Sequence, residues 1–324
     1  MNALTDADEQ QLQKTLTQVQ QRVAAGDELQ ALAAALKMEH GNSVLAILYY
    51  GSCLRSGRAD EGIADFYVLV DSYRQAGMKP IIAILNRLLP PNVYYLETSF
   101  QGKTLRAKYA VIRIDQFKKG VTGGWFLPYL WGRFAQPSGM LWTKDEATYN
   151  NIMSWLIQSL SYFIEQGTAL MADTFTSKQL WETSLRNSYQ TELRAERNER
   201  IAGLFDFWPD YYVAQTQLIL TTKGYATTID TEIGEELLYR SLLDIKQQRQ
   251  GRRRWWLRKI VGKLTALLKL VKSLLTFNGA MDYAAWKIER HSGQKVELPN
   301  YARRWPLIGG WIILMRLLRR GSLR

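Results

Sequence analysis

A run of seven apolar residues from Val44 to Tyr50 ends in the pair Gly51-Ser52. A continuous apolar run of this length that stops at a Gly-containing turn is typical of a strand buried on both faces. Residues 7–37, which precede it, place apolar side chains at helical spacing with a break at Gly26-Asp27. Helices combined with a buried sheet predict an α+β fold.

Other segments extend both patterns along the chain. Residues 176–250 are charged, and we expect helices there without obvious chemistry. Further strands are expected at 65–71, 93–96 and 108–115, and helices at 79–89, before Pro90-Pro91, and around 152–164. The predicted units are 1–140, 141–250 and 251–324.

Composition excludes several classes of site. The 324 residues are 47% hydrophobic, which suits a globular protein with a sizeable core. One cysteine, Cys53, and two histidines, His40 and His291, are too few for a Cys/His metal cluster or a disulfide framework. We expect a reducing compartment.

No targeting or membrane-crossing segment is predicted. Three acidic residues precede the first basic residue, Lys14, unlike a signal or transit peptide, so we expect the mature chain to begin where the sequence does. The longest apolar candidate, Leu307 to Leu318, contains Arg316 and is shorter than the ~20 residues that a spanning helix needs.

Positive charge is concentrated at the end of the chain. Residues 251–324 contain 17 Lys and Arg against 3 Asp and Glu, a net charge of +14, while the whole chain is +12. The first 250 residues are therefore close to neutral, with 25 basic against 27 acidic side chains. This uneven spread favours a surface-binding tail over general binding of polyanions, and no nucleic-acid partner is expected.

The Gly51-Ser52 turn also carries candidate chemistry, because Asp65 follows it thirteen residues after Ser52. A small Gly lets backbone N–H groups approach a triphosphate, and Ser adds a hydroxyl donor. Carboxylates hold Mg²⁺, which stabilises charge on leaving pyrophosphate. This outline resembles the polymerase-beta-like nucleotidyltransferase motif, although Tyr67 stands where that motif has a second acid.

Two further acids are candidates for the same site. Asp71 lies on the same strand as Asp65, but six residues at ~3.3 Å each place it about 20 Å away. Asp115, at the end of the third strand, is the better expected partner of Asp65 at the metal. A structural role for Asp71 stays open.

A series of short motifs makes the resemblance more specific. In order they are Tyr50-Gly51-Ser52, Asp65-Phe66, Val70-Asp71, Lys108-Tyr109-Ala-Val-Ile and Gly132-Arg133-Phe134 with Pro137. The series resembles that of the mitochondrial-type phosphatidate cytidylyltransferases (the translocator assembly and maintenance family) and their bacterial relatives. That family pairs an early Asp with a later Val-Asp, which is compatible with Tyr67 here.

The resemblance implies a fold, a reaction and a set of site residues. A polymerase-beta-like domain would precede a helical or winged-helix-like domain and a C-terminal membrane-contacting helix. The substrates would be CTP and phosphatidic acid, with Mg²⁺ as cofactor, CDP-diacylglycerol as product and pyrophosphate released. The residues implied are Tyr50, Gly51 and Ser52 for the triphosphate, Asp65 for the metal, and Lys108 or Arg133 for a phosphate. Both basic residues could instead have structural roles, Arg133 in a surface ion pair.

The basic tail contains an amphipathic segment at 252–277. Its apolar face is formed by Leu257, Ile260, Val261, Leu264, Leu267, Leu268, Val271 and Leu275. This pattern is typical of a helix that lies in a membrane interface. The expected lipid contacts are Arg252, Arg253, Arg254, Trp255, Trp256, Arg258 and Lys259. The protein would then be peripheral, at the cytoplasmic face of an anionic membrane such as a bacterial inner membrane.

Other interpretations remain at this point. The apolar face of 252–277 could pack on the body of the protein. The enzyme could transfer a nucleotide to a soluble acceptor. Loss of the second acid would also fit a non-catalytic membrane adaptor on the same fold.

Overall fold

The computed structural model describes residues 4–23, 26–56, 62–192, 198–233 and 236–276. The helices are α1 (Asp6–Val23), α2 (Asp27–His40), the short 3₁₀ turn η1 (Gly41–Ser43), α3 (Ser52–Ser56), α4 (Pro80–Leu88), α5 (Ile114–Val121), α6 (Trp131–Phe134), α7 (Glu146–Thr168), α8 (Ser177–Tyr189), α9 (Asn198–Asp206), α10 (Pro209–Lys223) and α11 (Ile245–Thr276). The strands are β1 (Val44–Tyr50), β2 (Ala64–Val70), β3 (Asn92–Phe100), β4 (Lys103–Arg113), β5 (Gly139–Thr143), β6 (Thr174–Thr176), β7 (Ala226–Ile233) and β8 (Glu236–Ser241).

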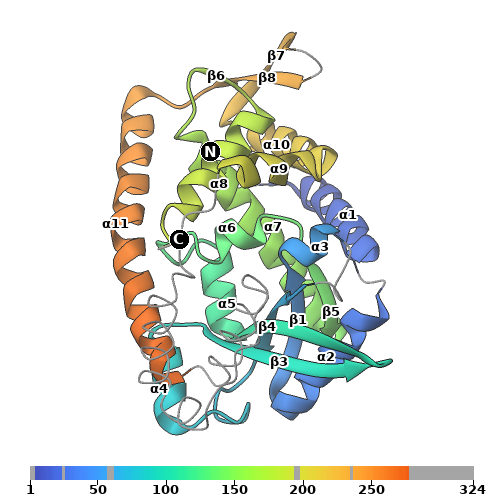
Figure 1. Cartoon of the computed structure of the whole chain (residues 1–324). Coiled ribbons are helices and arrows are strands. Elements are labelled where there is room, and N and C mark those ends of the chain that lie inside the picture. Colours follow the sequence, from blue (N-terminus) through green and yellow to red (C-terminus); the bar gives the residue numbers. More distant parts are fainter. Residues whose placement is uncertain (1–3, 24–25, 57–61, 193–197, 234–235, 277–324) are drawn as a thin grey trace, which may run out of the picture.

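A five-stranded mixed sheet of order β3-β4-β2-β1-β5 forms the centre, with β2 and β4 parallel and the other pairs antiparallel. Helix α2 covers one face, where His40 contacts the edge of Tyr109 at 5.5 Å between ring centroids. Helices α5 and α6 cover the other face, where Phe117 and Phe134 pack on Tyr67. The fold is therefore α+β, as predicted, with helices on both faces of the sheet (Figure 1).

The strand predictions are confirmed in position, with one consequential difference. Strand β1 has the predicted bounds, and β2 is displaced by one residue. Strand β4 ends at Arg113, and Asp115 lies in the first turn of α5 instead of closing the strand. No Gly or Pro separates β4 from α5, so the sequence carries no break signal at the point where the strand ends and the helix begins.

The segment expected to be only helical also contains strands. Strands β6, β8 and β7 form a second, antiparallel sheet beside α8 and α10. Its longest strand, β7, is rich in β-branched Thr and Ile, which was an available strand signal. Strand β5 pairs with β1, so the first structural unit continues past residue 140.

Helix α11 runs along the outside of the molecule (Figure 1, orange) and contacts the body through a stripe of small and polar residues. A Cβ at Gly251 would lie 2.2 Å from Cβ of Ala169, and one at Gly262 would lie 2.5 Å from the carbonyl oxygen of Thr191. These two glycines let the helix backbone approach the body closely. Between them, the Trp255 indole is 1% exposed and donates to the carbonyl of Gln166 at 2.8 Å.

Arg258 is the main polar anchor of α11 and is 2% exposed. Its guanidinium donates to the carbonyl of Phe126 at 2.9 Å and to Oε1 of Gln166 at 2.7 Å. The rings of Phe126, Trp131 and Trp255 lie about it at 4.8–5.3 Å. Burial lowers its pKa to about 10, which still leaves it charged near neutral pH. The prediction that Trp255 and Arg258 contact lipid is therefore wrong, because both are buried against the body.

The apolar side of α11 faces away from the body. Leu264 and Leu268 are each 60% exposed, so the interpretation that this face packs inward is wrong for the described residues. The exposed apolar side chains are Trp256, Leu257, Ile260, Val261, Leu264, Leu267 and Leu268, which we call the outer face of α11.

Within the described residues, no helix combines the length and apolar character needed to cross a bilayer. The expected helix at 282–291 and the apolar segment at 305–320 lie outside the described residues.

Replacing Arg258 by Ala is expected to loosen α11. The change leaves the Phe126 carbonyl and the Gln166 amide without their donor and removes three ring contacts, at a cost of about 2–4 kcal/mol. Backbone amides of α11 should then exchange hydrogen faster, as measured by mass spectrometry. Arg253→Ala, on the same helix but exposed, is the matched control. Equal protection of α11 in both variants would contradict this account of its docking.

Candidate functional site

The Gly51 turn and Asp65 are in direct contact. Tyr50 ends β1 and lies opposite Asp65, the second residue of β2, in the antiparallel ladder. Gly51 has φ +93°, and a Cβ at this position would lie 2.7 Å from Oδ2 of Asp65. The Asp65 carboxylate therefore occupies the space beside the Gly51 backbone, and only a residue without a side chain leaves it there.

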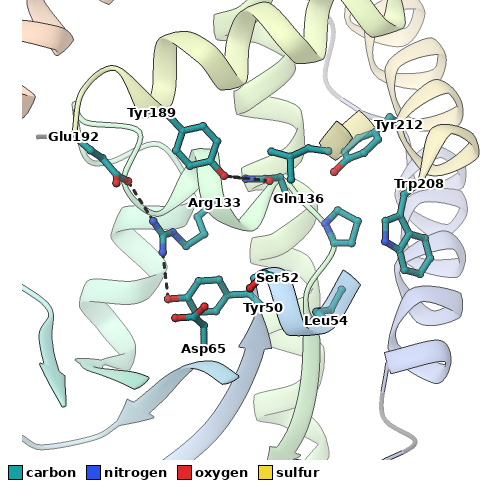
Figure 2. Close-up of a pocket in the computed structure, with 13 residues that line it drawn as sticks. Tyr50, Ser52, Leu54, Asp65, Arg133, Gln136, Tyr189, Glu192, Trp208 and Tyr212 are labelled. Atoms are coloured by element: carbon teal, nitrogen blue, oxygen red, sulfur yellow. Dashed lines mark hydrogen bonds and ion pairs between the residues drawn. The ribbon is translucent and has the colours of Figure 1, made fainter. Parts of the chain in front are cut away.

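A pocket of about 290 Å³ opens at this turn. Figure 2 shows Tyr50, Ser52 and Asp65 on its lower side and Arg133 above them. Ser52 begins α3 and is exposed, so its hydroxyl is available at the pocket. Tyr50, Gly51, Ser52, Asp65 and Arg133 therefore line one pocket, and their predicted contacts with a nucleotide and a metal stay predictions.

Arg133 is fixed within the pocket by two bonds. Its guanidinium donates to the Tyr50 hydroxyl at 3.2 Å and pairs with Oε1 of Glu192, also at 3.2 Å (Figure 2). It also lies over the Tyr50 ring, 5.1 Å from the centroid. The expected ion pair exists, but it lines a pocket, and the fork of Arg133 retains further N–H donors.

Tyr50, which is partly buried, and Tyr67, which is buried, lie beside Asp65. Burial raises the pKa of the Tyr50 phenol, with Asp65 acting in the same direction and Arg133 opposing it, and burial also raises that of Tyr67. Both phenols are therefore neutral near pH 7. Tyr67, two residues along β2 from Asp65, points to the same face and packs on Tyr50 and Phe134. An aromatic ring thus occupies the position where a second acid would stand.

Lys108 lies on the other side of Asp65. Strands β2 and β4 are parallel with Asp65 opposite Lys108, so the two side chains leave the sheet on the same face. Tyr50, Asp65 and Lys108 therefore form one row across three strands. Lys108 is near the acid but does not line the pocket.

The structure separates Asp115 and Asp71 from Asp65. The register pairs Asp65 with Lys108 but Val70 with Arg113, so β2 and β4 both end about 16 Å beyond Asp65. Asp115 follows that distant end, is 58% exposed in its side chain and pairs with Arg113 at 2.9 Å. The prediction that Asp65 and Asp115 share a metal ion is therefore wrong.

Asp71 lies at the same distant end of the sheet and has a structural contact. It accepts a hydrogen bond from the Ser43 hydroxyl at 2.5 Å, and its amide donates to the Ser43 carbonyl at 3.0 Å. These bonds join the end of β2 to the turn before β1. This favours the structural role that the sequence left open.

The described part of the chain offers few ligands for a metal ion. No group of three or more His, Cys, Asp or Glu side chains capable of holding a metal occurs among the described residues. In the pocket lining, Asp65 and Glu192 are the described carboxylates, and Glu192 pairs with Arg133. Mg²⁺ is commonly held by one or two carboxylates together with substrate phosphates, so Asp65 can serve as the protein ligand.

The far wall of the pocket comes from the segment in which no chemistry was expected. Glu192, Trp208 and Tyr212 line it, together with Tyr189, whose hydroxyl lies 3.5 Å from the Gln136 amide. An aromatic cluster at 207–212 was visible in the sequence. Such a cluster is equally typical of a core, so only the fold identifies it as part of the pocket.

Replacing Gly51 by Ala is expected to disrupt this contact and to destabilise the protein. The new methyl group would overlap the Asp65 carboxylate and sit at an unfavourable positive φ, at a cost of about 2–3 kcal/mol. Gly77→Ala (φ +84°, open space) should show only the backbone cost, and Gly203→Ala, with open space and no positive φ, neither effect. Chemical denaturation of the three variants measures the difference. Equal stability of the Gly51 and Gly77 variants would contradict the close approach.

Comparison with known proteins shows no family for this chain. No protein-family model matches the chain, and no curated protein matches it. Among solved structures, it is similar to a nucleotidyltransferase-like protein from Exiguobacterium sibiricum, with 8% identity over 67% of this chain and 100% of that one. The TM-score of 0.27 is too low to support a conclusion about fold or function.

Proposed function

We propose that the chain is a nucleotidyltransferase that binds an Mg²⁺-nucleotide between the Gly51 turn and Arg133. The supporting observation is the Asp65 carboxylate held directly against Gly51 at the floor of a pocket. Gly51 gives a nucleotide access to backbone N–H groups, and Ser52 adds a hydroxyl donor. Asp65 and the substrate phosphates would hold Mg²⁺, whose charge stabilises the pyrophosphate as it leaves.

The reaction that we propose is the transfer of CMP from CTP to phosphatidic acid. A phosphate oxygen of the lipid attacks the α-phosphorus of CTP, and the bond from this phosphorus to the bridging oxygen breaks. The bonding electrons leave with pyrophosphate, and CDP-diacylglycerol is the other product. The support for CTP and phosphatidic acid is the motif resemblance together with the basic helix α11.

The chain's own groups position and polarise the substrates. A phosphate monoester is ionised near neutral pH and needs no general base, and the described lining of the pocket contains no His. Arg133 uses one N–H for Tyr50 and one for Glu192, and its remaining donors can bind a phosphate. Preorganised charge of this kind acts at no reorganisation cost during the reaction.

Helix α11 supports a membrane location for this reaction. Its outer face is apolar, and Lys259 and Lys263 lie along one edge of that face at helical spacing. Arg252, Arg253 and Arg254 lie near its N-terminal end. Apolar side chains bordered by cations suit the interface of an anionic bilayer. We therefore propose a peripheral protein on such a surface.

Helix α4 carries a second set of exposed apolar side chains. Ile81, Ile84 and Leu88 are exposed at helical spacing on α4. Lys272 of α11 donates to the carbonyl of Pro91 at 3.1 Å and contacts Asn86 at 3.4 Å, so the two helices adjoin. Both elements can therefore contribute to one membrane contact.

One observation favours an alternative. Tyr67 occupies the position of a second acid, as expected of a non-catalytic adaptor on this fold. Turnover of CTP would exclude this role. A soluble phosphate monoester in place of phosphatidic acid, and ATP in place of CTP, test acceptor and base in the same assay.

Asp65→Asn is expected to reduce pyrophosphate release from CTP, Mg²⁺ and phosphatidic acid vesicles by about 10³-fold, because the metal loses its protein carboxylate. Thermal unfolding should show an intact fold. Asp115→Asn is the control and should retain wild-type activity, since Asp115 is exposed at the distant end of the sheet. A fully active Asp65 variant would refute the assignment.

Replacing both Leu264 and Leu268 by Glu is expected to weaken binding to anionic vesicles by at least about tenfold in a sedimentation assay, because each Leu contributes about 1.5–3 kcal/mol when buried. Met38→Glu is the control, since Met38 is 85% exposed on α2, a different helix from α11. Unchanged binding of the double variant would show that the outer face does not contact lipid.

A further inference from the structure

Lys269 of α11 contacts Tyr129, a ring that Arg133 of the pocket also contacts. Its side chain is partly buried, and Nζ lies 3.4 Å from the centroid of the Tyr129 ring. In the described part of the chain, no hydrogen bond or ion pair of this ammonium accompanies the ring contact. A desolvated ammonium normally acquires an oxygen partner, so this position points to a group that the protein does not itself supply.

Arg133 shares the same ring. Its Cζ lies 5.6 Å from the centroid of Tyr129, and it also lines the pocket beside Tyr50. Tyr129 therefore joins a cation of α11 to a cation of the candidate site. Lys272, one turn further along α11, donates to the carbonyls of Leu89 and Pro91 and adds a further positive charge near Lys269.

Positive charge predominates around Lys269. Lys272 and Arg133 are the cations that act on it, and Glu192, the carboxylate that acts on it, already pairs with Arg133. Burial, with the charges of Lys272 and Arg133, lowers the pKa of Lys269 to about 7, and Glu192 opposes the shift. Burial raises the pKa of Tyr129, so that phenol is neutral. An anion bound between the cations would reverse the shift of Lys269.

We propose that Lys269 and Arg133 form an anion-binding position for a phosphate group, beside the Tyr129 ring that both cations contact. This inference rests on the proposed function and adds a residue from the C-terminal helix to the site. Together the two cations can hold a phosphate monoester dianion. Arg133 would bind it through parallel N–H bonds, and Lys269 would act as a point charge. Helix α11 would thus bind the membrane through its outer face and the phosphate through Lys269.

The test follows Lys269 itself by NMR of the full chain with ¹³C-methylated lysines. Lys269→Met identifies the signal. Glycerol 3-phosphate represents an acceptor headgroup and pyrophosphate represents the nucleotide's phosphates, with glycerol as the uncharged control. We expect glycerol 3-phosphate to raise the pKa of Lys269 from about 7 to about 8 or higher, and glycerol to leave it unchanged.

Binding measured by calorimetry provides the second readout. Lys269→Met should bind glycerol 3-phosphate about tenfold more weakly, and Lys263→Met, exposed on the same helix, should bind it as the wild type does. A pKa raised by glycerol 3-phosphate supports a phosphate site for the acceptor, and a pKa raised by pyrophosphate alone supports a phosphate site for the nucleotide. An unchanged pKa with both anions, or equal binding by the Lys269 variant, would overturn the site.

The proposed function fails independently of this inference. If the wild type binds Mg²⁺-CTP and releases pyrophosphate while Lys269 ignores both phosphates, the inference alone falls. If phosphates bind at Lys269 but CTP is never turned over, the nucleotidyltransferase assignment falls and the anion site stands.

Discussion

The contact between the Asp65 carboxylate and the Gly51 backbone organises the candidate site. It arises because β1 and β2 pair with Tyr50 opposite Asp65, so the end of one strand brings a turn and the start of the next brings an acid. Positive φ at Gly51 turns the chain sharply without a side chain in the way. Arg133 then closes the pocket from α6, held by the Tyr50 hydroxyl on one side and Glu192 on the other. Each of these groups depends on a different element, so the pocket exists only in the folded protein.

Helix α11 inverts the usual orientation of an amphipathic helix on a globular body. Its polar and small residues face inward, where Arg258 is surrounded by aromatic rings, and its leucines face outward. Burying an arginine without a carboxylate partner is costly, and the aromatic faces and two oxygen acceptors offset that cost. The arrangement leaves the outer face available for an apolar partner, while Lys269 contacts the Tyr129 ring that Arg133 also contacts.

Sequence patterns predicted the parts of the structure that depend on local periodicity. The apolar run of β1 and the Gly51-Ser52 turn gave the position of the pocket, and Asp65 follows from the head of the next strand. Asp115 was misplaced because strand direction and register are long-range properties: the parallel pairing of β2 with β4 puts it at the wrong end of the sheet. Trp255 and Arg258 were misassigned for a related reason, since a helical wheel shows which side chains share a face but not which face meets the body. Glu192 joins the pocket lining only through tertiary packing.

The most direct test of the account is calorimetric binding of CTP to the wild type and to Asp65→Asn, with Mg²⁺ and with a chelator. The account predicts that CTP binds the wild type in the presence of Mg²⁺ and that this cation-dependent part of the affinity is absent from the variant. The same affinity with and without the cation, or the same affinity in both proteins, would contradict a metal-nucleotide site at the Gly51 turn.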